Sequence, residues 1–161
     1  MVIVLIGPMG CGKTTIGKRL AAMLGYDFDD GDDFHPPANI DKMRTGIPLD
    51  DDDRLGWLHT LRHRIDMRRQ AGKGLVLACS ALKKQYRDLL GVDQRQVATV
   101  YLKGSAELLG ERLNGRDHQY MNKTLLASQL AAMEEPDDGL VIDIGQDPET
   151  ICQKIIYKLQ L

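Results

Sequence analysis

Eight residues near the start of the chain have the types and spacing of a phosphate-binding loop. Gly7-Pro8-Met9-Gly10-Cys11-Gly12-Lys13-Thr14 satisfies the pattern G-x-x-x-x-G-K-[ST]. Glycines allow positive φ angles and a close backbone approach, so successive N–H groups can surround phosphate oxygens. Lys13 adds a positive charge beside the β- and γ-phosphates, and the Thr14 hydroxyl is an oxygen ligand suited to Mg²⁺. The pattern predicts a site for ATP and Mg²⁺, formed by Gly7, Pro8, Met9, Gly10, Cys11, Gly12, Lys13, Thr14 and Thr15.

An acidic segment, Asp30-Gly31-Asp32, follows a short strand predicted over residues 26–30. The carboxyl ends of strands in a parallel sheet line the ligand crevice, so we expect both carboxylates to face the terminal phosphate. Two acids one residue apart can divide the work, one holding Mg²⁺ through water and the other accepting a hydroxyl proton. A solvated acidic turn is the structural alternative. The acids at positions 50–53 are instead expected to stabilise the start of a long helix through its dipole.

Two basic residues, Lys83 and Arg87, stand four apart in a stretch compatible with a helix. They would share one helical face and could clamp a carboxylate, although solvated basic side chains are the simpler interpretation. The apolar run before them ends Ala78-Cys79-Ser80, without the aspartate that usually ends the magnesium-binding strand of motor and switch NTPases. That difference argues against both classes.

The elements that must position these residues alternate between apolar strands and amphipathic helices. This order predicts an α/β fold, a three-layer sandwich whose parallel sheet is covered on both sides, and one domain over residues 1–161. Leu55, Leu58, Leu61 and Ile65 are expected to form the buried face of the long helix. Strands are predicted over residues 2–6, 26–30, 75–79, 97–102 and 140–144, and helices over 16–24, 51–72, 82–90, 105–113, 123–134 and from 148 onward, the last capped by Asp147.

Composition limits the partners and the compartment. The chain has 161 residues and a formal net charge of −2 without a basic cluster, so we expect no nucleic-acid partner. The apolar run Val2–Ile6 is far too short for a leader or a membrane span, and we expect no membrane partner. Three cysteines without a C-x-x-C pattern indicate neither a disulfide framework nor a zinc site, which fits a cytoplasmic protein.

With these segments in view, the chain resembles the gluconate kinase (thermoresistant gluconokinase) family, which sits beside shikimate kinase and the nucleoside monophosphate kinases. The resemblance covers nearly the whole chain. It implies transfer of the γ-phosphoryl group of ATP to the 6-hydroxyl of D-gluconate, in a P-loop kinase fold like that of shikimate kinase, with strand order 2-3-1-4-5 and often a homodimer. The segments that carry it are Asp30-Gly31-Asp32-Asp33-Phe34-His35-Pro36, Asn39 through Met43, Gly46-Ile47-Pro48-Leu49, Asp51-Asp52-Asp53-Arg54 with Trp57-Leu58, and Cys79-Ser80-Ala81-Leu82-Lys83-Lys84 with Tyr86-Arg87-Asp88.

The resemblance also implies roles for particular residues. Asp32 would accept the sugar hydroxyl proton, and Asp30 would orient Mg²⁺ through water. A mobile lid over residues 114–122 would bring Arg116 onto the transferring phosphate, although Arg116-Asp117-His118-Gln119-Tyr120 departs from the family's Arg-x-Gly-His-Phe. Residues 31–50 would form part of the substrate-binding region. The residues implied to bind the polyol acid are Asp32, His35, Arg54, Lys83 and Arg87, and those implied near adenine are Arg112 and Gln146.

Two alternatives remain open at this stage. The chain could be a kinase for another small sugar acid or polyol, and the segment Cys79-Ser80-Ala81 lacks the glycine triplet of shikimate kinases. It could also be a nucleotide-binding regulatory module without a substrate. That interpretation leaves the acidic segment and the Lys83 and Arg87 pair unexplained.

Overall fold

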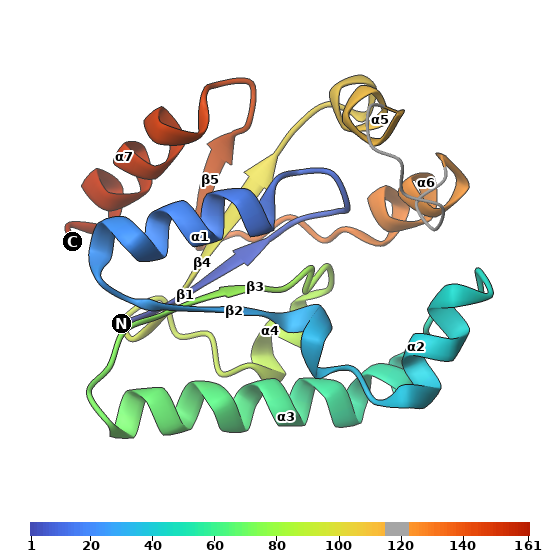
Figure 1. Ribbon diagram of the computed structural model, residues 1–161, viewed down its shortest axis with the longest axis horizontal. Helices are drawn as coiled ribbons and strands as arrows, with labels where there is room; N and C mark the ends of the chain where they lie inside the picture. Colours follow the sequence, from blue (N-terminus) through green and yellow to red (C-terminus); the bar gives the residue numbers. More distant parts are fainter. Residues whose placement is uncertain (115–122) are drawn as a thin grey trace.

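The computed structural model describes residues 1–114 and 123–161, in which a parallel sheet lies between two layers of helices (Figure 1). The strands are β1 (Val2–Ile6), β2 (Asp27–Asp30), β3 (Leu75–Ala78), β4 (Val97–Lys103) and β5 (Leu140–Asp143). The helices are α1 (Lys13–Leu24), a 3₁₀ turn η1 (Gly31–Phe34), α2 (Pro37–Arg44), α3 (Asp51–Gln70), α4 (Lys84–Leu89), α5 (Ala106–Asn114), α6 (Lys123–Ala132) and α7 (Pro148–Leu159). The strand order is β2-β3-β1-β4-β5 with every pairing parallel, which confirms the predicted fold class and topology.

The central strand β1 shows why the sheet needs helices on both faces. All five of its residues are buried, and successive side chains alternate between two cores. Ile3 and Leu5 pack on the side of α1, α5 and α7, whereas Val2, Val4 and Ile6 pack on the side of α3 and α4. Figure 1 shows the same division, with α1 and α7 on one face of the sheet and α3 on the other.

The sheet brings the two chemically interesting loops to one edge. The loop after β1 leads into α1, the turn after β2 forms η1, and β3 lies between these strands. The Gly7 N–H donates to the Ser80 carbonyl at 3.2 Å, and Asp30 pairs in register with Ala78 of β3. The ends of three neighbouring strands therefore fix the relative positions of the glycine-rich loop and the acidic turn.

Several local predictions are confirmed at helix ends. The predicted end of the first helix at residue 24 is correct, because Gly25 follows α1 in the left-handed conformation, with φ of 66°. The Asp147 carboxylate caps α7 by accepting from the Thr150 N–H, with Pro148 in the first turn. Asp50 and Asp53 form a reciprocal capping box at the start of α3, which explains the run of acids there.

Two sequence predictions differ from the structure. No helix was predicted between residues 30 and 51, but α2 forms there with Pro37 in its first turn, where the missing N–H and fixed φ favour a helix. Leu55 was expected on the buried face of α3, but it is 45% exposed. Trp57 is buried in its place, so the inward face is shifted round the helix. None of the helices in the described parts of the chain is long and apolar enough to cross a membrane.

Gly31 offers a test of how tightly the acidic turn is packed onto β3. A Cβ atom built at Gly31 would lie 2.7 Å from the Ala78 carbonyl oxygen, which cannot move without disturbing the sheet. We expect Gly31→Ala to lower the free energy of unfolding in urea by about 1–3 kcal/mol. Gly56→Ala is the matched control, because Gly56 lies within α3 with no atom near the added methyl. It should raise the free energy by about 0.5–1 kcal/mol, and equal stability of Gly31→Ala and the wild type would contradict the packing.

Candidate functional site

The glycine-rich loop adopts a conformation that depends on its glycines. Gly7, Gly10 and Gly12 have φ angles of 143°, 81° and 94°, in the region that side chains disfavour. A Cβ at Gly7 would also lie 2.9 Å from Cys11 Sγ and 3.1 Å from the Leu102 carbonyl. Gly12 precedes α1, and no side chain in the described residues caps the first turn of that helix. Its N–H groups are therefore available to an anion.

Lys13 crosses this loop. Its Nζ donates to the Gly7 carbonyl at 2.8 Å and to the Pro8 carbonyl at 3.1 Å. The ammonium group is thus held over the loop by two neutral acceptors, and no carboxylate neutralises it among the described residues. A phosphate entering the loop would meet a full positive charge.

The acidic turn lies directly beside the start of α1. The Thr14 hydroxyl donates to Asp30 Oδ2 at 3.0 Å, and the Asp32 N–H donates to Asp30 Oδ1 at 3.0 Å. Asp30 is therefore fixed between Thr14 and the backbone of η1, which leaves the Asp32 carboxylate facing an open cleft. The oxygen atoms of Thr14 and Asp30 suit Mg²⁺. Proteins usually hold this ion with one or two residues, while phosphates and water supply the other ligands. No group of three or more His, Cys, Asp or Glu side chains gathers as a metal site within residues 1–114 and 123–161.

The surroundings of Asp32 raise its affinity for a proton. Its side chain is 73% exposed to the cleft, but the protein mass beneath it raises its pKa by desolvation. The Asp30 carboxylate raises the pKa of Asp32 further, whereas Lys13 lowers it. A carboxylate with a raised pKa is a better proton acceptor than a free aspartate.

A buried aromatic pair supports the acidic turn from below. His35 stacks on Trp57 with ring centroids 4.2 Å apart, and Trp57 Nε1 donates to the Gly31 carbonyl at 2.7 Å. His35 Nδ1 lies 3.3 Å from Asn39 Nδ2, a donor, so Nδ1 accepts and Nε2 carries the hydrogen. Nε2 in turn lies 3.8 Å from Asp32 Oδ1. Burial lowers the pKa of His35 to about 4, with the Arg54 charge as a second cause.

The cleft beside Asp32 has a volume of about 300 Å³. It is bounded by the phosphate loop, the acidic turn, α3, the segment after α2 and α6. The predicted residues that it brings together are Met9, Gly10, Gly12, Lys13, Thr14, Thr15, Asp30, Asp32, His35 and Arg54. The loop and the acidic turn therefore share one cavity, as the sequence analysis required.

Arg54 enters the cleft from the first turn of α3. Its Nη1 donates to the Leu49 carbonyl at 2.6 Å and to the Tyr86 hydroxyl at 3.2 Å. The guanidinium also lies over the Tyr86 ring, 5.4 Å from its centroid. Since a guanidinium has five N–H donors, these contacts fix Arg54 and leave donors for an anion.

The predicted clamp of Lys83 and Arg87 is not assembled. Lys83 lies at the N-cap of α4 and pairs with Asp51 at 3.2 Å. Arg87 is 5% exposed, and its guanidinium donates to the carbonyls of Ala81, Leu82 and Glu134 at 2.9, 3.1 and 2.7 Å. Neither residue lines the cleft. Arg87 instead ties the segment after β3 to the one after α6, because buried carbonyls need donors.

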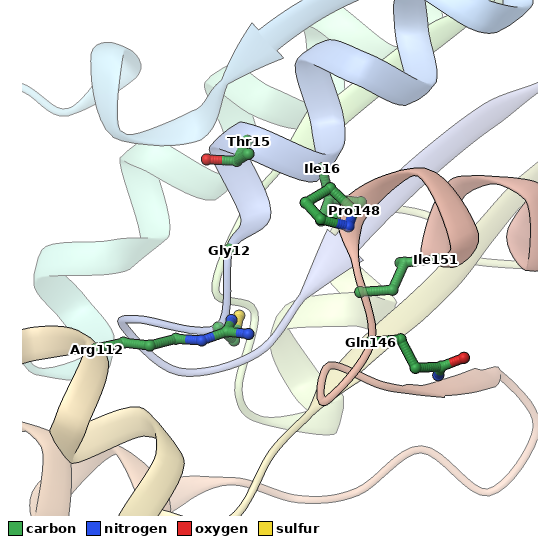
Figure 2. A pocket seen from close by; sticks show the side chains of 8 residues that line it. Gly12, Thr15, Ile16, Arg112, Gln146, Pro148 and Ile151 are labelled. Atoms are coloured by element: carbon green, nitrogen blue, oxygen red, sulfur yellow. The ribbon is translucent and has the colours of Figure 1, made fainter.

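A second cavity of about 350 Å³ adjoins the other side of the phosphate loop. Figure 2 shows Arg112 reaching in from α5, while Gln146, Pro148 and Ile151 lie on the side of α7. Arg112 Nη2 donates to the Ile144 carbonyl at 2.9 Å, and Gln146 Nε2 to the Asp143 carbonyl at 2.9 Å. The remaining lining residues are Cys11, Gly12, Thr15 and Ile16. A planar ligand group with polar edges, joined to a phosphate in the loop, would fit this arrangement.

The sequence did not indicate that α6 lines the main cleft. The predicted lid cannot be compared with the structure. Ser128 and Gln129 of α6 line the same cleft as Asp32, and Met9 N–H donates to Gln129 Oε1 at 2.7 Å. The spacing of Leu125, Ser128 and Ala132 could have indicated a shared helix face. Arg116 lies outside the residues that the structure describes, as does the lid predicted over 114–122 apart from its first residue.

Comparison with known proteins places these features in context. The model of the family described as shikimate kinase matches residues 9–160. The chain is 41% identical to a gluconokinase of Gluconobacter oxydans, over 98% of this chain and 90% of that protein. It is also 41% identical to the thermosensitive gluconokinase of Escherichia coli, over 94% of this chain and 83% of that protein. The crystal structure of a gluconokinase from Sinorhizobium meliloti superposes with a TM-score of 0.87 at 37% identity, covering 99% of this chain and 91% of the other.

The buried His35 predicts a pH dependence of stability. Its pKa is about 4 in the folded protein and 6.5 when unfolded, so the unfolded chain binds the proton first as the pH falls. Neutral His35 therefore makes its full contribution to the free energy of unfolding above pH 6.5. As the pH falls to 4, the free energy of unfolding decreases by about 3 kcal/mol through this group. The free energy of unfolding, measured in urea and plotted against pH, should therefore fall with a clear slope between pH 7 and 4.

His35→Gln should flatten the slope, whereas His59→Gln, on an exposed part of α3, should leave it in place. The same slope in His35→Gln and the wild type would contradict the assignment.

Proposed function

Because the chain belongs to the gluconokinase family, within the wider shikimate kinase group, we propose that it transfers the γ-phosphoryl group of ATP to the 6-hydroxyl of D-gluconate. The observation that carries this function is the shared cleft. The phosphate loop, Lys13, the Thr14–Asp30 pair and Asp32 all border one cavity of about 300 Å³. The product is 6-phospho-D-gluconate.

The nucleotide would occupy both cavities. Its phosphates would bind the N–H groups of the loop and the start of α1, with Lys13 against the β- and γ-phosphates. Its base would enter the cavity lined by Arg112 and Gln146. Thr14 and Asp30 would hold Mg²⁺, Asp30 through water, and this ion supplies charge neutralisation on the phosphate oxygens when it is bound.

Asp32 would act as the general base. The gluconate hydroxyl oxygen forms a bond to the γ-phosphorus as the bond from that phosphorus to the bridging oxygen of ADP breaks, and the hydroxyl proton passes to Asp32. Lys13 would stabilise the charge on the transferring group, by about 4 kcal/mol at ~4 Å and an effective dielectric constant near 20. Arg116 is proposed to close over the same group.

Arg54 is the group best placed to hold the carboxylate of gluconate. It keeps donors free within the cleft, and its position is fixed by Leu49 and Tyr86. His35 lines the cleft as a neutral ring and can donate only from Nε2. Lys83 stays a candidate at the margin, whereas Arg87 contributes no donor here. The homodimer and the cytoplasmic location stay predictions.

An acceptor panel tests this function. We expect gluconate to stimulate ADP release from ATP and Mg²⁺ more than other aldonates, shikimate or nucleoside monophosphates. A better acceptor among the other sugar acids would change the substrate assignment. No stimulation by any acceptor would favour a regulatory nucleotide-binding module.

Asp32→Asn is the sharpest variant for the proposed chemistry. Removal of the base should lower kcat by at least about a hundredfold, because general bases contribute typically 10²- to 10⁴-fold. The dissociation constant for ATP, measured by calorimetry, should change little. Asp33→Asn is the matched control, since Asp33 is adjacent but does not line the cleft. Full turnover by Asp32→Asn would remove Asp32 from the mechanism.

A further inference from the structure

Several residues of helix α6 line the cleft that also contains Asp32. Leu125, Ser128, Gln129 and Ala132 all line it, and their spacing of three and four residues places them on one face of the helix. Figure 1 shows α6 at the same end of the sheet as the loop after β1, across from α2. Two polar side chains stand between Leu125 and Ala132. Ser128 is exposed, whereas Gln129 is half-buried, so its polar atoms need partners.

Gln129 has one such partner, in the phosphate loop. The Met9 N–H donates to Gln129 Oε1 at 2.7 Å, across 120 residues of sequence. A backbone N–H can only donate, so the amide must turn its oxygen towards the loop. The Nε2 group then points away from Met9, and it makes no hydrogen bond to another residue in the described ranges 1–114 and 123–161. Two oriented donors are thus left beside the cleft.

The position of these donors decides what they would meet. Gln129 is bound to the loop that holds the phosphates, and it lines the same cavity as Asp32 and Arg54. An acceptor whose hydroxyl lies between Lys13 and Asp32 would occupy the cavity that Gln129 lines. A polyol acid carries many oxygen acceptors, and the acidic turn in the same cleft offers it mainly carboxylates, which cannot donate.

We propose that Gln129 is a positioning and specificity residue for the phosphoryl acceptor, its Nε2 donating to an oxygen of the polyol acid while Met9 N–H fixes the orientation of the amide. This inference rests on the proposed function. It adds α6 to the acceptor site. The same Gln129 side chain would then contact both the acceptor and the phosphate loop.

The competing interpretation is that Gln129 only packs α6 against the loop. Gln129→Glu separates the two, because a carboxylate has nearly the same shape and can still accept from Met9 N–H. It cannot donate, and it places a negative charge beside an anionic acceptor. A packing role predicts that any change is confined to nucleotide binding, because the new charge lies beside the phosphate loop, whereas the positioning role predicts a larger loss of acceptor affinity.

We expect Gln129→Glu to raise KM for gluconate by at least about tenfold, since a lost donor and an unpaired acceptor each weaken binding. KM for ATP and the dissociation constant for ADP should rise by less than KM for gluconate, because the new charge also lies beside the loop that holds the phosphates. Gln70→Glu is the matched control, because it makes the same change at the far end of α3, 16 residues and roughly 24 Å from Arg54. It should leave every constant unchanged.

Each result has a definite meaning. An unchanged KM for gluconate in a folded Gln129→Glu protein, or a loss confined to kcat or to nucleotide binding, would overturn the proposed role. If that variant does not fold, Gln129→Met removes the donor at similar size and should raise the same KM, and a normal KM would again overturn the proposal. A wild-type protein without gluconate turnover would overturn the proposed function, and this inference with it.

Discussion

The contact between the Thr14 hydroxyl and the Asp30 carboxylate, 3.0 Å long, is the constraint on which the rest of the site depends. It joins the first turn of α1 to the end of β2, although β3 lies between β2 and β1 in the sheet. Asp30 then receives the Asp32 N–H on its other oxygen, so the base candidate is oriented by the proposed metal ligand. A parallel sheet makes this contact possible because its strands all end at the same edge.

Around this contact, some ionisable side chains face the cleft, where a ligand would bind, and others are buried and bonded within the protein. Lys13, Asp32 and Arg54 face the cleft. Lys13 Nζ is held by backbone carbonyls, and the backbone of Asp32 is held by its N–H bond to the Asp30 carboxylate. His35 lies beneath the acidic turn, buried and neutral, and Arg87 gives its donors to backbone carbonyls. Such preorganisation suits phosphoryl transfer, in which positioning and electrostatic stabilisation supply most of the catalysis.

Sequence reasoning identified the parts of this site that depend on local chemistry. The glycine-rich loop needs residues with positive φ, and Asp30 and Asp32 follow a strand, so both could be placed from the chain alone. Long-range partners could not be placed in that way. Arg87 shares a helix with basic neighbours in the sequence, but its environment is decided by carbonyls as distant as Glu134. Gln129 gave no signal by type, because its partner Met9 lies 120 residues away.

The central claim is that the terminal phosphorus and the acceptor hydroxyl meet between Lys13 and Asp32. A crystal structure with a non-hydrolysable ATP analogue, Mg²⁺ and gluconate measures this directly. The account predicts the γ-phosphate beside Lys13 Nζ and the primary hydroxyl of gluconate within hydrogen-bonding distance of the Asp32 carboxylate. Gluconate bound with that hydroxyl turned away from Asp32, or a triphosphate bound outside the loop, would contradict it.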